Sequence, residues 1–116
     1  MSKEEVEKYL ESLINKIDLS NYNVIFEDED EKDTATMLKL EIKSETERIE
    51  YVKKLTYREY CEGPKHDTKH GGYYWVFGKN IKNELIYIKI NKGFKNKPVI
   101  IISFHIKEHK MDFPLK

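Results

Sequence analysis

Apolar side chains near the start of the chain recur at the spacing of a single helical face. They predict an amphipathic helix over residues 3–17, whose apolar stripe consists of Val6, Leu10, Leu13, Ile14 and Ile17. Ser2 and Glu5 have the spacing of a capping box, in which each side chain accepts a hydrogen bond from the other residue's backbone N–H. The helix is therefore expected to begin directly after Ser2.

The helical pattern is broken at Asn21 and Asn23. The apolar run at 22–26 predicts a short strand or an extended connector, and the acidic run at 27–31 predicts a solvated loop, because like charges repel.

Two further helices are expected before residue 56. Asp33 is expected to cap a short helix over 34–40. Ser44 and Glu47 repeat the capping-box spacing and predict a helix over about 45–54.

The second half of the chain changes to the period of a β-strand. Strands are predicted over 57–62, 73–79, 85–90 and 99–106, separated by a loop at 63–72, a tight connection near Lys82 and Asn83, and a loop at 91–97. Strands in series with short links form an antiparallel meander. The sequence thus predicts an α+β fold, in which N-terminal helices pack on one face of a C-terminal antiparallel β-sheet.

Alternation sorts the side chains of the last two strands onto two faces. One face is apolar and is expected to contact the helices through Ile86, Ile88, Ile90, Ile100, Ile102, Phe104 and Ile106. The opposite face is expected to carry Leu85, Tyr87, Lys89, Val99, Ile101, Ser103 and His105. On strand 73–79, Lys79 shares a face with Tyr73, Trp75 and Phe77, but alternation alone leaves open which side of the sheet that is.

Composition agrees with a globular protein, since 39% of the residues are hydrophobic and 36% are charged. The 116 residues correspond to one domain, with 1–56 mainly helical and 57–116 mainly antiparallel sheet. No window approaches the roughly 18 apolar residues of a membrane helix, the N-terminus lacks the apolar core of a signal peptide, and the single Cys61 has no partner for an internal disulfide. These features predict a cytoplasmic protein with no membrane partner.

The net charge is zero, but it is unevenly distributed. Residues 1–56 hold 15 acidic and 9 basic residues, whereas residues 57–116 hold 6 acidic and 12 basic residues and all four histidines. A basic half that carries aromatic side chains suits a polyanion. A polar domain with unevenly charged solvated faces is the alternative.

The face with Tyr87, Lys89 and His105 suits RNA cleavage. That reaction needs a base for the 2′-hydroxyl proton, an acid for the leaving 5′-oxygen and a cation near the phosphate. An ordinary solvated sheet face is again the alternative. The i, i+4 pairs His66/His70 and His105/His109 would bind a metal only on one helix face, and they fall in a predicted loop and at a strand end. No metal is therefore expected, although a small metalloprotein stays open as a third class.

Several short motifs resemble the MqsR-like toxins of type II toxin–antitoxin modules. They are W-V-F-G-K at 75–79, I-Y-I-K-I at 86–90, I-I-S-F-H at 101–105 and the tail E-H-K-M-D-F-P at 108–114, preceded by V-I-F at 24–26 and L-K-L-E-I at 38–42. The resemblance spans about residues 22–114 and is sharpest over 75–114.

This resemblance implies a RelE-like fold and a metal-independent endoribonuclease, an mRNA interferase, that needs no cofactor. Its partners would be mRNA and a cognate antitoxin, in this family often one with a zinc-binding domain. The family's active-site tyrosine corresponds to Tyr87 and its C-terminal basic residue to His105. The other residues expected to act on RNA are Lys89 and Lys79 as catalytic cations, and Trp75, Tyr73 and Lys65 as binding residues.

Two positions depart from the family prototype. Cys61 follows Tyr60 where the prototype has a lysine, and Val76 follows Trp75 where it has a glutamine. These departures keep a rival interpretation open, in which a non-catalytic binding or immunity-like protein uses the same basic sheet face. RNA cleavage separates the two.

Overall fold

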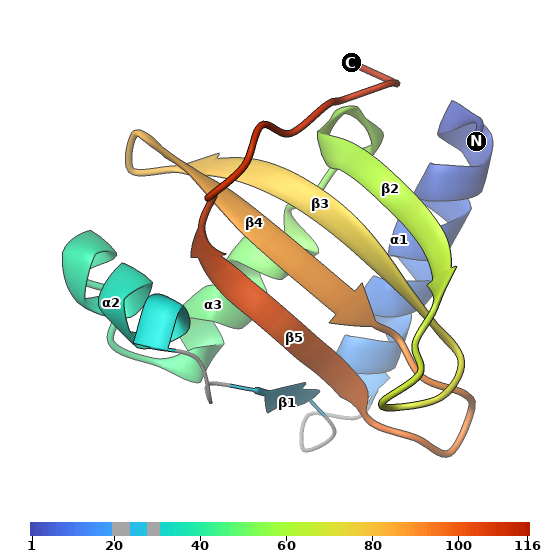
Figure 1. The fold of residues 1–116 in the computed structure, drawn as a ribbon. Coiled ribbons are helices and arrows are strands. Elements are labelled where there is room, and N and C mark those ends of the chain that lie inside the picture. The colour runs from blue at the N-terminus through green and yellow to red at the C-terminus, as the bar shows by residue number, and fades with distance from the viewer. Residues whose placement is uncertain (20–23, 28–30) are drawn as a thin grey trace.

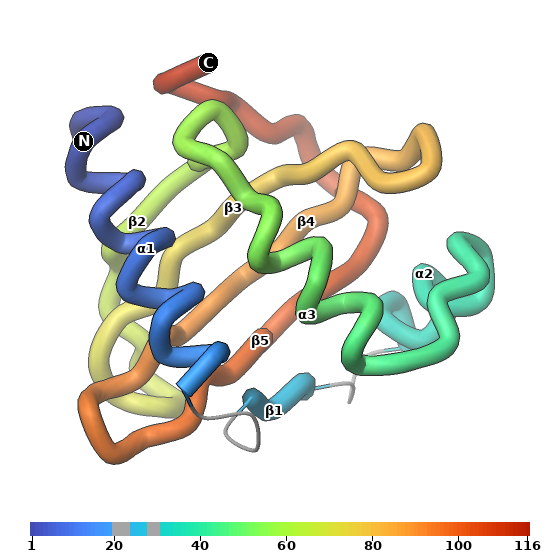
Figure 2. Tube along the Cα trace, turned by 180° about the vertical axis from the view of Figure 1, so that it is seen from behind, coloured from blue at the N-terminus to red at the C-terminus, as the bar shows by residue number. Residues whose placement is uncertain are grey.

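The structure is a computed structural model that describes residues 1–19, 24–27 and 31–116. Its elements, in chain order, are α1 (Lys3–Leu19), β1 (Val24–Phe26), α2 (Glu31–Leu40), α3 (Glu45–Lys53), the 3-10 turn η1 (Tyr57–Glu59), β2 (Tyr60–His66), β3 (Tyr73–Ile81), β4 (Glu84–Asn91) and β5 (Val99–Ile106). Figures 1 and 2 show α1 and α3 against one face of the sheet, with α2 beside β5. The α+β prediction is confirmed.

The helices begin where local chemistry predicts. Ser2 and Glu5 exchange the two hydrogen bonds of a capping box, each 3.1 Å long. The hydroxyl of Ser44 accepts a hydrogen bond from the backbone N–H of Glu47 at 3.1 Å and caps α3. Residues 22–23 of the predicted strand and 28–30 of the predicted acidic loop lie outside the described residues, and β1 occupies the rest of the strand. The last residue of the predicted loop, Glu31, instead begins α2.

The five strands form one sheet in the order β1-β5-β4-β3-β2. Strands β2 to β5 are an antiparallel meander as predicted, but β1 pairs with β5 in parallel, so the sheet is mixed. Lys82 and Asn83 form the two-residue link between β3 and β4, both with positive φ, 50° and 71°. Such turns match the twist of the strands they join.

A β-bulge in β5 changes which of its side chains face the helices. Lys89 pairs with Ser103, but the next residue of β4 pairs with Ile101, so Ile102 is the extra residue. Before the bulge, Val99 and Ile101 are buried, and the predicted core residues Ile100 and Ile102 are only half-buried. The face prediction was wrong here, because a bulge shifts a period-two pattern by one residue.

Two other sequence predictions need correction. The strand expected over 57–62 is a 3-10 turn at its start, and β2 continues to His66, where Lys65 and His66 pair with β3. Asp33 does not cap α2, which begins at Glu31. Its buried carboxylate instead accepts a hydrogen bond from the backbone N–H of Phe104 on β5, at 3.4 Å.

Helix α2 also completes the outer edge of β5. β1 pairs with only three residues of β5, so the rest of β5 is an edge of the sheet. There the hydroxyl of Thr36 accepts a hydrogen bond from the backbone N–H of Ile106 at 2.9 Å. Backbone groups of a buried sheet edge need such hydrogen-bond partners. The core lies between this sheet and the helices α1 and α3. Its fully buried side chains are Val6, Leu13, Val52, Phe77, Ile81, Ile86, Ile88, Ile90, Val99, Ile101 and Phe104.

Candidate active site

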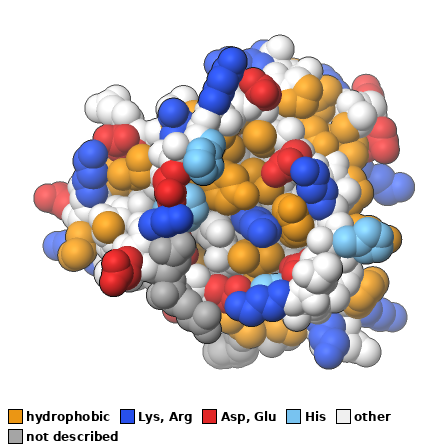
Figure 3. Space-filling model, in the orientation of Figure 1, with side chains coloured by type: hydrophobic (Ala, Val, Ile, Leu, Met, Phe, Trp, Pro, Cys, Tyr) orange, Lys and Arg blue, Asp and Glu red, His pale blue; other side chains and the backbone are white. Residues whose placement is uncertain are grey.

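A groove of about 620 Å³ lies on the sheet face that α1 does not cover. We call it the open-face groove, and its lining residues are Lys32, Cys61, Glu62, Tyr87, Lys89, Ser103, His105, Glu108, His109, Lys110, Met111 and Asp112. The structure therefore brings Tyr87, Lys89, Ser103 and His105 together, as alternation predicted. Figure 3 shows that this side of the molecule carries acidic as well as basic side chains among hydrophobic ones.

His105 is held against Tyr87 with a defined ring orientation. The residues pair across β4 and β5, and their rings stack with centroids 5.1 Å apart and planes 15° apart. The Nδ1 atom of His105 lies 2.9 Å from the backbone carbonyl oxygen of Ile106. A carbonyl oxygen only accepts, so Nδ1 carries a proton. In the neutral ring, Nε2 then has the lone pair and can accept a proton.

Tyr87 keeps its hydroxyl proton at neutral pH. Burial raises its pKa to about 12, and the neighbouring Glu62 adds to the increase. The phenol is therefore a hydrogen-bond donor and an acid rather than a base.

Lys89 supplies a cation beside these two rings. Its ammonium lies 4.1 Å from the ring centroid of Tyr74, a cation–π contact on the open face. The carboxylates of the groove, in contrast, pair with other lysines: Glu62 with Lys65 at 2.7 Å, Glu108 with Lys32 at 2.7 Å and Asp112 with Lys110 at 4.0 Å. Within the described part of the chain, Lys89 has no carboxylate partner, so its charge is available to an anion.

The C-terminal segment forms one wall of the groove, a feature that sequence reasoning missed. After β5 the chain crosses β4 and β3 (Figure 1), and its side chains Met111 and Phe113 pack over Gly78. A Cβ atom at Gly78 would come within 2.7 Å of the Phe113 ring and 2.9 Å of the Met111 methyl group. The absence of a side chain at this position allows the segment to lie flat, which brings His109 and Lys110 to the groove.

Three predicted site residues lie elsewhere. Lys79 is on the helix side of the sheet, where its ammonium lies 3.2 Å from the Glu59 carboxylate. Trp75 is buried and stacks on Tyr9 at 4.0 Å. Tyr73 shares this side and is 49% exposed. Alternation left open which side of the sheet their face occupies. The structure places it on the helix side, because Phe77, the central residue of this face, belongs to the core, so the three do not lie on one surface with His105 as a common site would require.

The two departures from the toxin prototype have different surroundings. Cys61 lines the open-face groove, and burial raises the pKa of its thiol, so it is neither a cation nor a ready nucleophile. Val76 is fully buried, although its partner in the β3–β4 register is Lys89, a residue that lines the groove. Lys65, a predicted RNA-binding residue, pairs with Tyr74 at the outer strand β2 and is exposed.

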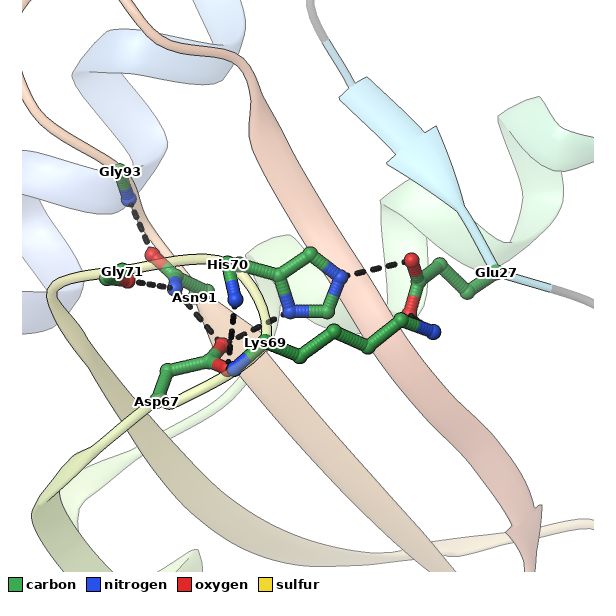
Figure 4. Close-up of polar contacts among 7 residues, drawn as sticks. All are labelled: Glu27, Asp67, Lys69, His70, Gly71, Asn91 and Gly93. Carbon is green, nitrogen blue, oxygen red and sulfur yellow. Dashed lines mark hydrogen bonds and ion pairs between the residues drawn. The ribbon is translucent and has the colours of Figure 1, made fainter.

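A second polar cluster surrounds His70 (Figure 4). Its Nδ1 lies 2.9 Å from the Asp67 carboxylate and its Nε2 lies 2.7 Å from that of Glu27, at the end of β1. The hydrogen bond to Glu27 raises the pKa of His70, and the bond to Asp67 adds to this, although burial opposes both. Since carboxylates only accept, both ring nitrogens donate and neither is free for proton transfer. The cluster joins distant segments rather than forming a second active site.

Comparisons with known proteins do not place the chain in a family: no family model, no curated protein and no solved structure matches it. No group of three or more potential metal ligands occurs among the described residues. Within the same residues, none of the helices has the length and apolar character needed to cross a membrane.

Proposed function

We propose that this protein is a metal-independent endoribonuclease that cleaves mRNA and acts as the toxin of a type II toxin–antitoxin module. The observation that carries the proposal is the position of His105, whose Nδ1 lies 2.9 Å from the Ile106 carbonyl oxygen and whose ring stacks on Tyr87 in one groove with Lys89. This contact makes Nδ1 the donor, so that Nε2 of the neutral ring can act as a base. The resemblance of the motifs around these residues to MqsR-like toxins supports the same reaction.

In the proposed reaction the 2′-oxygen of the RNA attacks the adjacent phosphorus atom. His105 Nε2 takes the 2′-hydroxyl proton, the phenol of Tyr87 donates a proton to the departing 5′-oxygen, and the P–O5′ bond breaks. Lys89 stabilises the additional negative charge on the phosphorane. The products are a 2′,3′-cyclic phosphate and a 5′-hydroxyl end. Such an enzyme would act in the cytoplasm and would be held inactive by an antitoxin bound over the open-face groove.

Cleavage of a synthetic RNA tests this proposal. His105→Ala is expected to lower the rate by about 10²–10⁴-fold, the usual contribution of a proton-transfer group. The matched control is His66→Ala, since His66 is exposed on β2 and does not line the groove. Lys89→Gln should also slow cleavage, whereas Lys97→Gln, in the exposed β4–β5 loop, should not. EDTA should have no effect.

Two results would overturn the proposal. Equal rates for His105→Ala and the parent chain would remove His105 from the reaction. A purified chain that cleaves no RNA, with or without ribosomes, would favour the alternative of a non-catalytic binding protein, in which Cys61 and Val76 mark the loss of catalysis.

A further inference from the structure

A second pocket, of about 380 Å³, lies between α1, the start of β3 and the loop after β4. We call it the aromatic pocket, and it is lined by Tyr9, Pro64, Gly72, Tyr73, Trp75, Asn91, Lys92, Gly93 and Phe94. It shares no lining residue with the open-face groove. Its volume is within the range of small-molecule sites.

The walls of this pocket are aromatic and partly open to solvent. Trp75 and Tyr9 stack with centroids 4.0 Å apart, while Phe94 is 66% exposed and Tyr73 is 49% exposed. These two are the only aromatic side chains among the large hydrophobic residues exposed in the described part of the chain, and both line the pocket. Apolar surface left open beside a cavity is typical of a binding site for a planar ring.

The hydroxyl of Tyr9 is buried and has no hydrogen-bond partner among the described residues. A buried hydroxyl without a partner destabilises a fold. The ring that carries this hydroxyl lines the pocket, so a ligand whose hydrogen-bonding ring edge reaches the hydroxyl would give it a partner.

Two lysines beside the pocket have no carboxylate partner within the described residues. Lys92 lines the pocket, where its ammonium lies 2.9 Å from the Ser12 hydroxyl and 5.1 Å from the Tyr9 ring centroid. Lys16 donates to the carbonyl oxygens of Lys92 and Phe94, and its ammonium lies beside Gly93. Burial lowers the pKa of both lysines, and their mutual repulsion contributes for Lys16. An anion at this position would relieve the repulsion.

We infer that the aromatic pocket binds a nucleotide, with its base against Trp75, Tyr73 and Phe94 and its phosphate at Lys92 and Lys16. A nucleobase combines a planar ring with hydrogen-bonding edges, and a phosphate supplies the anion. The same chemistry occurs in a free mononucleotide and in the terminal nucleotide of an RNA strand. The inference does not depend on cleavage at the open-face groove.

Fluorescence of Trp75, the only tryptophan of the chain, reports directly on this pocket. Titration with AMP, GMP, CMP and UMP is expected to change it saturably with at least one nucleotide, and the corresponding nucleoside should bind about tenfold more weakly. Lys92→Gln should weaken binding by a similar factor, whereas Lys95→Gln, an exposed lysine of the same loop, should not. Tyr9→Phe should weaken binding without lowering the stability of the free protein.

A second titration distinguishes a free nucleotide from the end of an RNA strand as the ligand, and other results would contradict the inference itself. A 5′-phosphorylated RNA tetranucleotide is tested on the His105→Ala variant, so that the strand is not cleaved. If the end of an RNA strand is the ligand, the tetranucleotide should bind as tightly as the mononucleotide. If a free nucleotide is the ligand, the tetranucleotide should bind more weakly. No saturable signal with any of these probes would overturn the inference. Equal affinities of the parent, Lys92→Gln and Tyr9→Phe would do the same, even if RNA cleavage is observed.

Discussion

Replacement of His70 by alanine tests how the chain holds its distant segments together. The imidazolium lies between the carboxylates of Asp67, in the loop before β3, and Glu27, at the end of β1. Its side chain is only 12% exposed and that of Asp67 is 7% exposed, so water replaces the lost contacts poorly. We expect His70→Ala to lower the free energy of unfolding and to loosen the attachment of β1.

The size of the effect follows from the contacts that are lost and those that remain. A hydrogen bond between charged groups contributes about 1.5–3 kcal/mol. Asp67 retains the side-chain amide of Asn91 at 2.9 Å and the backbone N–H groups of Lys69 and His70 at 3.1 and 3.0 Å, and Glu27 is 20% exposed and can turn to solvent. The loss should therefore be about 2–3 kcal/mol, near the value of one or two such bonds.

This contribution depends on pH in a defined direction. Because the folded-state pKa of His70 is raised, its stabilisation is fully present below the unfolded value of about 6.5 and is lost as the pH rises through the folded-state pKa. Burial raises the pKa of Asp67, but the hydrogen bonds from Asn91 and His70 outweigh it and leave a net decrease. The contribution of Asp67 to stability is present above the pKa of the unfolded chain and is lost as the pH falls through its folded-state pKa.

Urea denaturation at about pH 6 and about pH 9 measures the contribution of His70 and its dependence on pH, because Asp67 stays ionised at both values. The parent chain should lose stability between the two, and His70→Ala should be less stable at the lower pH but should change less with pH. His66→Ala, an exposed histidine four residues earlier, is the control and should behave like the parent. If His70→Ala and the parent show the same pH dependence, His70 is not the group responsible, and the reasoning from the two carboxylates fails.

Three further predictions concern other contacts. Gly78→Ala should displace Phe113 and expose the C-terminal segment to trypsin at a lower protease concentration, as should Phe113→Ala; equal resistance of both variants and the parent would contradict the packing over Gly78. Ser44→Ala should cost about 1 kcal/mol in urea denaturation through loss of the bond to Glu47 N–H, and no measurable cost would contradict the cap. Cys61 should react with a thiol reagent only at a pH above that of an ordinary free thiol, because burial raises its pKa; rapid reaction at neutral pH would show otherwise.

The sequence predicted the features that depend on neighbours along the chain. The capping residues Ser2 and Ser44, the turn at Lys82 and Asn83, and the alternation on β4 all act within a few residues, so their patterns are readable without the fold. The shared face of Tyr87 and His105 followed from the same alternation, because the β5 bulge lies before Ser103 and leaves the end of the strand in phase.

Only the tertiary structure decided the features that depend on pairing between distant segments. The bulge at Ile102 reversed the faces of the first half of β5. Trp75 packs on α1 and Lys79 pairs with Glu59 of η1, both away from the open face. The contact of Phe113 with Gly78 and the link from His70 to Glu27 join residues 35 and 43 positions apart. Such contacts form because packing and hydrogen bonding across the whole molecule outweigh small local preferences. Local spacing therefore determined which side chains could act, and long-range packing determined which of them meet.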